Sequence, residues 1–157
     1  LEISAPGAYL IDMTTSSPQL ARDISEVAEL SGKHAFDAPV TGGPQGAAAG
    51  TLTIFCGTDA ETLAGVRDVL ACMGSKIVCF GAAGKGQLAK LANQTALAGA
   101  MVGFAEGLAF AKQAGLDLAQ TLDALAGGMA DSKALSTFGP KVLAGDYAPG
   151  FTVDHYV

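Results

Sequence analysis

The sequence predicts an α/β domain followed by an all-helical segment built on one long helix. Over the first half of the chain, short apolar runs typical of strands alternate with amphipathic runs typical of helices. After Gly81 the β-branched runs stop, and one helical pattern extends from about Lys85 to Ala114, where Gly115 ends it. A helix of this length is too long for a globule of 157 residues unless it is the axis of a helical domain. We therefore expect one domain over residues 1–81 and a second over 82–157.

The elements of the first domain follow from the same patterns. We expect strands at residues 8–13, 34–40, 51–56 and 76–80, and helices at residues 18–30 and 60–73. The glycine-rich stretches at residues 41–46 and 81–86 are expected to be loops. Neither stretch fits GxxxxGK[ST], or GxGxxG between a strand and a helix, so ATP chemistry is disfavoured.

Composition excludes several classes of protein. With 50% hydrophobic and 15% charged residues the chain is globular rather than disordered. A net charge of −6 without clusters of Lys or Arg argues against nucleic-acid binding. The apolar run at residues 95–111 contains Glu106 and falls short of the ~20 residues of a membrane span, so a buried helix is expected and no membrane partner.

Cysteine and histidine usage argues against a metal centre. The three cysteines lack CxxC spacing and stand in apolar strings, which predicts reduced, buried thiols in a cytoplasmic protein. His34 and His155 are far apart, so no zinc ligand set is available and no metal is predicted. We assign no chemistry to either histidine.

Glycines recur every fourth residue in the long helix. Gly99, Gly103 and Gly107 form a ridge of small residues along one face, which another helix can approach closely. We expect a tight helix crossing, either inside the domain or in a homo-oligomer interface.

Two groups of residues are candidates for a site. Thr41, Gly42 and Gly43 follow an expected strand, where α/β folds bind ligands, and adjacent glycines expose backbone N–H groups to a carboxylate. Gln87, Lys90 and Gln94 share one face of the long helix. Lys90 is able to donate a proton in a cleft while Gln94 bonds the same substrate oxygen. The alternatives are turn-forming glycines and a solvated helix face.

Three ordered motifs resemble the β-hydroxyacid dehydrogenase family. They are DAPVTGG (residues 37–43), GAAGKGQLAKLANQ (81–94) and PGFTVDH (149–155), and IDMTTSSP (11–18) is similar to the family's cofactor-contacting strand and turn. KLANQ together with GGMADS (127–132) looks most like the tartronate semialdehyde reductases. The family also includes 3-hydroxyisobutyrate dehydrogenases and, more distantly, 6-phosphogluconate dehydrogenases.

The resemblance implies a fold and a set of roles. Residues 1–81 would be the second part of a Rossmann-type domain that binds NAD or NADP, and residues 82–157 a truncated helical domain. Thr15 would lie near the nicotinamide, and Thr41, Gly42 and Gly43 would hold the substrate carboxylate. Lys90 would be the catalytic acid/base. Gln94 stands where many members have Asn, although the reductase-like members also carry Gln.

The resemblance also implies missing parts. The glycine fingerprint that binds the cofactor's pyrophosphate would lie upstream of Leu1, and further helices with a basic residue near the cofactor would follow Val157. We therefore expect an oxidoreductase of short 3-oxo acids whose 157 residues are inactive alone. A non-catalytic assembly module and a phosphosugar dehydrogenase of the same family are the alternatives.

Overall fold

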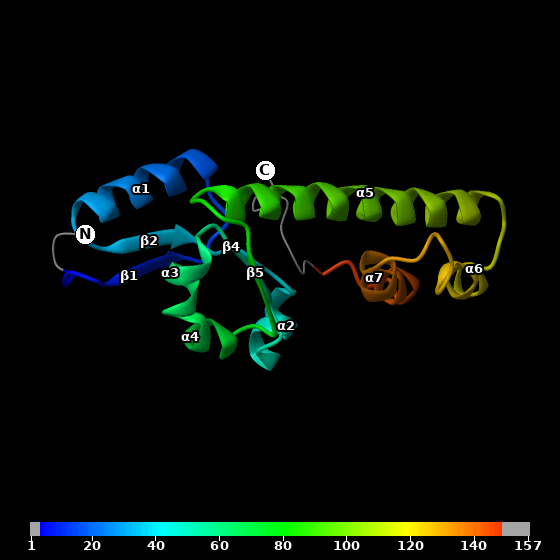
Figure 1. Cartoon of the computed structure of the whole chain (residues 1–157). Coiled ribbons are helices and arrows are strands. Elements are labelled where there is room, and N and C mark those ends of the chain that lie inside the picture. Colours follow the sequence, from blue (N-terminus) through cyan, green and yellow to red (C-terminus); the bar gives the residue numbers. More distant parts are fainter. Residues whose placement is uncertain (1–3, 149–157) are drawn as a thin grey trace. The chain divides into compact units, whose positions relative to one another are not determined.

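The computed structural model describes residues 4–148 and contains two compact units, residues 1–92 and 93–157. The first unit holds all five strands of the described residues and the start of the long helix (Figure 1). The unit boundary falls inside the long helix because its first turns pack on the strands. The assignment of residues 1–81 to a cofactor domain stays a prediction.

The first unit opens with a parallel pair of strands joined by a helix. β1 (Tyr9–Asp12) pairs with β2 (His34–Asp37), and α1 (Pro18–Leu30) connects them and packs against β2 (Figure 1). The helix begins at Pro18 because the Ser17 side chain accepts hydrogen bonds from the backbone N–H groups of Gln19 and Leu20. The predicted limits of α1 are confirmed.

The predicted strand at residues 34–40 is wrong as one element. It splits into β2 and β3 (Val40–Thr41) around Pro39, which has no N–H to donate to a strand partner. β3 pairs antiparallel with β4 (Thr53–Cys56), and β4 pairs in parallel with β5 (Lys76–Cys79). A bridge between Asp37 and Gly57 links the two sheets.

Two further expectations about helices need correction. The predicted loop at residues 41–46 is wrong from Gly43 onward, because the short helix α2 (Gly43–Ala49) begins there. The predicted helix at residues 60–73 is broken into α3 (Ala60–Ala64) and α4 (Arg67–Ala71). The break lies at Gly65, a poor helix former that packs closely against the Tyr9 ring.

The core of the first unit lies between the strands and α3–α4. Its buried apolar residues are Phe36, Ala38, Leu52, Ile54, Cys56, Leu63, Val66 and Leu70. Cys56 is buried, and burial raises the pKa of its thiol to about 11. The expectation that all three thiols are buried is wrong, because Cys72 and Cys79 are exposed.

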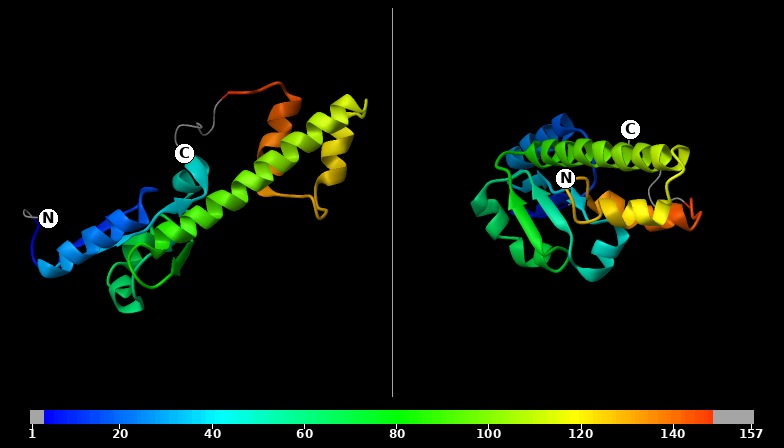
Figure 2. Two further views of the ribbon diagram at one scale, coloured as in Figure 1. Left: turned by 90° about the horizontal axis from the view of Figure 1, so that it is seen from above. Right: turned by 90° about the vertical axis from the view of Figure 1, so that its right-hand side faces the viewer.

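The long helix α5 (Lys85–Gln113) is confirmed at nearly its predicted limits. In the second unit, Phe104 and Leu108 of α5 are buried against Ala134 and Leu135 of α7 (Lys133–Leu143). α6 (Leu118–Leu125) adds partly buried leucines and packs against α7 (Figure 2).

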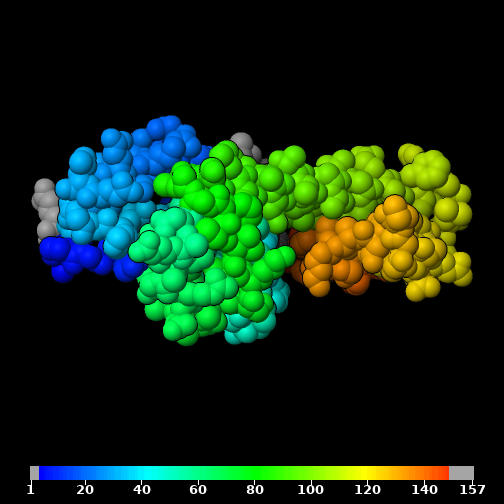
Figure 3. Space-filling view, viewed as in Figure 1, coloured from blue at the N-terminus to red at the C-terminus, as the bar shows by residue number. Residues whose placement is uncertain are grey.

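The glycine ridge of α5 has no neighbour among residues 4–148. A Cβ atom built at Gly99, Gly103 or Gly107 would meet nothing within 4 Å, and Val102 and Phe110 are exposed. Within the second unit, the space-filling view shows α5 (yellow-green) along the upper edge, with α6 (yellow) and α7 (orange) below it (Figure 3). The expected crossing inside the domain is therefore wrong for the described residues. Across the same residues no helix combines the length and apolar character needed to span a membrane.

Candidate active site

The chain leaves the carboxyl end of β1 in a turn that presents Thr15. The Asp12 carboxylate accepts hydrogen bonds from the Thr14 N–H (2.9 Å), the Thr14 hydroxyl (2.6 Å) and the Ser16 hydroxyl (3.1 Å). Burial raises the pKa of Asp12, but these hydrogen bonds outweigh burial and hold the pKa below its ordinary value. The turn is therefore ordered, while the Thr15 side chain stays exposed.

The start of α5 is anchored on β2. The carboxylate of Asp37, which is 1% exposed, accepts hydrogen bonds from the backbone N–H groups of Gly84 (2.7 Å) and Gln87 (2.6 Å). An anion at this end of the helix satisfies N–H groups that have no partner within it and complements the helix dipole.

Glycines allow this close approach. A Cβ at Gly86 would overlap the Phe55 carbonyl oxygen and stand 2.8 Å from the Asp37 carboxylate. Gly84 has a φ of +84°, and a Cβ there would stand 2.6 Å from the Pro18 carbonyl oxygen. The predicted loop at residues 81–86 thus contains glycines in turn conformations. It also contains Gly86, which lies in the first turn of α5 and allows that turn to pack closely.

Gln87 connects α5 to the turn after β1. Its side chain is fully buried; the amide oxygen accepts from the Ser16 N–H (3.0 Å) and the amide nitrogen donates to the Thr14 carbonyl oxygen (2.8 Å). The two bonds bracket Thr15. The first turns of α5 therefore contact the ends of both β1 and β2, where ligands bind in open α/β sheets.

Lys90 lies one turn further along α5 and is only 8% exposed. Burial lowers the pKa of its ammonium below the ordinary value, and within residues 4–148 no carboxylate pairs with it. This burial argues against the alternative of a solvated surface lysine. A lysine that shifts towards neutrality without an ion pair is suited to proton exchange. Its catalytic role stays a prediction that the burial supports.

The expected carboxylate loop lies at the end of β3. Thr41 is half-buried, whereas Gly42 and Gly43 are exposed and adopt φ values of +134° and +65°. These left-handed conformations suit glycine and leave the backbone uncovered. Gln94 lies on α5 one turn beyond Lys90, and its side-chain oxygen accepts a hydrogen bond from Asn93 (2.9 Å). The motif at residues 149–155 lies outside the described residues.

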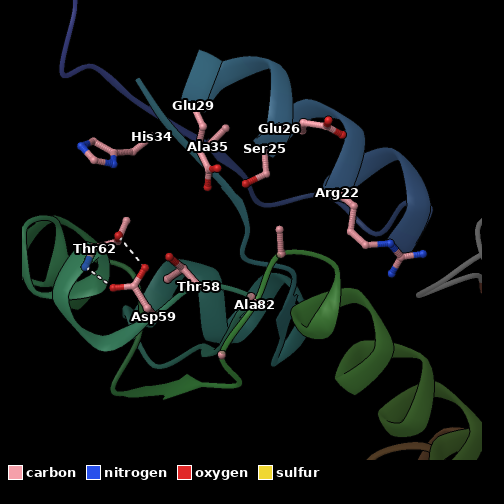
Figure 4. A pocket seen from close by; sticks show the side chains of 13 residues that line it. Arg22, Ser25, Glu26, Glu29, His34, Ala35, Thr58, Asp59, Thr62 and Ala82 are labelled. Atoms are coloured by element: carbon pink, nitrogen blue, oxygen red, sulfur yellow. Dashed lines mark hydrogen bonds between the residues drawn. The ribbon is translucent and has the colours of Figure 1, made fainter. Parts of the chain in front are cut away.

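The first unit also has a groove away from this site. A groove of about 540 Å³ lies between α1 and the loops around Thr58 and Ala82 (Figure 4). Its charged lining is mixed, with Arg22, Glu26, Glu29, His34 and Asp59. The groove includes none of the predicted site residues. We place the candidate site at α5 because the buried lysine and the ordered turn converge there, whereas the groove's ionisable side chains are exposed.

The sequence patterns predict no role for Asp37 or for the Gln87 amide. Gln87 belongs to the polar face of the long helix, and Asp37 is the first residue of the DAPVTGG motif. The signal available was an acidic residue inside an apolar strand run, since a buried carboxylate requires hydrogen-bond donors.

The residues present fit the nicotinamide end of a dinucleotide. The carboxyl end of β1 offers an exposed hydroxyl at Thr15 and backbone groups in an ordered turn, which suit the polar carboxamide of that ring. The motif GxGxxG, which holds the pyrophosphate in such folds, does not occur in the 157 residues. Among the described residues no group of His, Cys, Asp or Glu is arranged to hold a metal ion.

Comparison with known proteins agrees with this arrangement. Residues 1–81 match the family described as the NAD binding domain of 6-phosphogluconate dehydrogenase. Residues 84–157 match the family described as NAD-binding of NADP-dependent 3-hydroxyisobutyrate dehydrogenase.

The names of individual relatives agree with these family matches. A probable 3-hydroxyisobutyrate dehydrogenase-like protein of Arabidopsis thaliana is 44% identical over 96% of this chain and 45% of its own length. The 2-hydroxy-3-oxopropionate reductase of Escherichia coli is 36% identical over 96% of this chain and 51% of its own. The solved 3-hydroxyisobutyrate dehydrogenase of Mycobacterium tuberculosis, with L-serine, superimposes with a TM-score of 0.87 at 36% identity, covering 98% of this chain and 55% of that one.

The chain spans about half the length of the curated relatives it matches. The order of strands, the long helix and both matched families agree with the resemblance in the sequence motifs. The chain belongs to the β-hydroxyacid dehydrogenase family.

Proposed function

We propose that this chain forms the substrate-facing part of an NAD(P)-dependent dehydrogenase of short 3-hydroxy acids, working as a semialdehyde reductase in the reverse direction. The observation that carries the proposal is the burial of Lys90, without an ion pair in residues 4–148, on a helix fixed to the ends of β1 and β2. The substrate class is that of the family, of tartronate semialdehyde or 3-hydroxyisobutyrate type.

In this proposal the substrate is held at both ends. The exposed backbone of Gly42 and Gly43 and the Thr41 hydroxyl bind the carboxylate, and Gln94 bonds the carbonyl oxygen. Lys90 donates a proton to that oxygen as the carbonyl carbon receives a hydride, so the aldehyde becomes an alcohol and Lys90 becomes a neutral amine. Fixing both ends of a short acid supplies much of the rate, because the reacting atoms are already aligned.

The bound dinucleotide, NAD(H) or NADP(H), supplies or accepts the hydride. On this chain the Thr14–Ser16 turn would contact its nicotinamide end through Thr15. The residues that choose between the two cofactors by reading the ribose follow the glycine fingerprint in such folds, and that fingerprint does not occur in these 157 residues.

Assembly and location complete the proposal. We place the enzyme in the cytoplasm, supported by its free thiols, and expect it to associate with itself through the helical half. The open ridge at Gly99, Gly103 and Gly107, next to exposed Val102 and Phe110, supports that association.

The test is a chimera in which this chain replaces the aligned segment of the E. coli 2-hydroxy-3-oxopropionate reductase, called here the chimeric reductase. Tartronate, methylmalonate and succinate semialdehydes are offered with NADH or NADPH, and cofactor oxidation is followed by absorbance. We expect at least one semialdehyde to be reduced. A folded chimera that reduces none, beside an active parent, would overturn the proposal.

A further inference from the structure

The Gln87 amide is matched to the backbone around Thr15. The side-chain oxygen of Gln87 accepts a hydrogen bond from the Ser16 N–H at 3.0 Å, and its side-chain nitrogen donates one to the Thr14 carbonyl oxygen at 2.8 Å. An amide is the side chain that offers a donor and an acceptor on neighbouring atoms. Gln87 therefore binds the residues on both sides of Thr15 and leaves the Thr15 side chain exposed.

The same residue is tied to β2 through its main chain. The Gln87 N–H donates to the Asp37 carboxylate at 2.6 Å, and the Gln87 side chain is fully buried. In a buried site, a hydrogen bond that is lost leaves an unsatisfied polar group, so the arrangement resists displacement. The turn after β1 and the helix that carries Lys90 are thereby held together by one residue.

We propose that Gln87 is a positioning residue that fixes the Thr14–Ser16 turn relative to the helix carrying Lys90. The inference rests on the proposed function, in which Thr15 contacts the nicotinamide ring and Lys90 exchanges the proton. Hydride and proton transfer must occur at adjacent atoms of one carbonyl group, and small misplacements of aligned groups reduce rates strongly. Gln87 touches neither the cofactor nor the substrate in this proposal.

We call the hydrogen bonds of the Gln87 side chain to the Thr14–Ser16 turn the clamp. Hydrogen exchange in the 157-residue chain tests whether the clamp exists, without any cofactor. Gln87→Met keeps the volume of the side chain but loses both hydrogen bonds, and Gln113→Met makes the same change at the end of α5. We expect the Ser16 amide to exchange about tenfold faster in Gln87→Met and unchanged in Gln113→Met. The Ala38 amide, which donates to the Asp12 carbonyl oxygen at 2.7 Å, should keep its protection in both variants. Unchanged Ser16 protection in Gln87→Met would overturn the inference.

Gln87→Glu adds a readout that ordinary loss of packing does not move. A protonated carboxyl has one donor and one acceptor, like the amide, whereas a carboxylate only accepts and would face the Thr14 carbonyl oxygen. We expect Ser16 protection in this variant to be near that of the parent chain at low pH and to fall as the pH rises through the pKa of the introduced carboxyl. A Ser16 protection factor that does not change with pH in Gln87→Glu would overturn the inference. This result decides the question even if Gln87→Met fails to fold.

Kinetics of the chimeric reductase connect the clamp to catalysis. We expect Gln87→Met to lower kcat about tenfold with little change in the KM of the semialdehyde, because the Thr41–Gly43 loop is untouched. An unchanged kcat beside a loosened turn would overturn the positioning role and leave the proposed function standing. An inactive chimera that retains Gln87 would overturn the proposed function, while hydrogen exchange still decides whether the clamp exists.

Discussion

Lys90 shows how burial alone changes the acidity of a side chain. Its side chain is largely buried without a compensating carboxylate in residues 4–148, so the charged form is disfavoured and the pKa of the ammonium falls. A lysine at its ordinary pKa would hold its proton too tightly to act as a base in the oxidising direction. In the proposed function, this lowered pKa would suit Lys90 to exchange a proton in either direction.

The first prediction concerns the removal and the titration of Lys90 in the chimeric reductase. Lys90→Ala should lower kcat by about 10² or more with cofactor affinity nearly unchanged, whereas Lys112→Ala, exposed on the same helix, should have no effect. Because the ammonium is the donor, kcat for reduction should fall as the pH rises through the lowered pKa of Lys90, and kcat for oxidation should rise. Stopped-flow and steady-state rates across pH measure both. Near parental turnover in Lys90→Ala would show that the lysine has no part in the chemistry.

The second prediction concerns Gly43→Val. A side chain at a φ of +65° strains the loop and covers the backbone that is proposed to bind the carboxylate, so the KM of the semialdehyde should rise about tenfold or more. Gly32→Val is the matched control, because Gly32 has a φ of +64° and nothing within 4 Å of its Cβ position. Equal KM values in the two variants, measured in the chimeric reductase, would mean that the loop is only a turn.

At the scale of elements, the amino end of α5 has a different surrounding from its middle. The first turns are packed on Asp37, Phe55 and Gly57, whereas the glycines further along face open space. Glycine is therefore required at Gly86 by close approach, while at Gly99 no contact within residues 4–148 requires it and it lowers the intrinsic stability of the helix.

The third prediction compares Gly86→Ala with Gly99→Ala in the 157-residue chain. The new methyl group at position 86 would overlap backbone and carboxylate oxygens, so the free energy of unfolding should fall by about 1–3 kcal/mol. At position 99 it should stay the same or rise by up to about 1 kcal/mol, from the better helix propensity of alanine. Urea unfolding followed by circular dichroism at low protein concentration measures both. Equal destabilisation would contradict the packing at the start of α5.

At the scale of the whole molecule, the affinity of the 157-residue chain for the cofactor can be predicted. The fourth prediction is that the 157 residues alone show no reductase activity and bind NAD(H) or NADP(H) no better than about millimolar, because they lack the glycine turn and helix end that hold the pyrophosphate. Calorimetric titration with each cofactor measures this. Micromolar binding would reveal a complete site within the chain.

The fifth prediction concerns self-association. Light scattering should give the mass of a dimer or larger oligomer, because α5 presents an open glycine ridge beside exposed Val102 and Phe110. Gly103→Leu places a large side chain on that ridge and should shift the mass towards the monomer, while circular dichroism stays unchanged. A strict monomer at all concentrations would remove the ridge as an interface.

Local patterns in the sequence predicted α1 and α5 closely, because Ser17 with Pro18 and the apolar periodicity are contained in the segments themselves. These patterns gave wrong limits where contacts with other segments determine the backbone conformation. Residues 34–40 read as one strand, but Pro39 turns the chain into a second sheet, and residues 60–73 read as one helix, but it breaks where Gly65 meets Tyr9.

Ordered motifs predicted the family, and local hydrophobic patterns predicted α1, α5 and the approximate positions of most strands, because these signals are contained in short segments of the sequence. Contacts between distant segments form only in the folded chain. Asp37 and Gln87 make their hydrogen bonds only when residues about fifty to seventy positions apart come together. The pKa of Lys90 is lowered only when the folded chain buries its side chain. Contact between distant segments and loss of solvent are properties of the folded chain, and no local pattern encodes either.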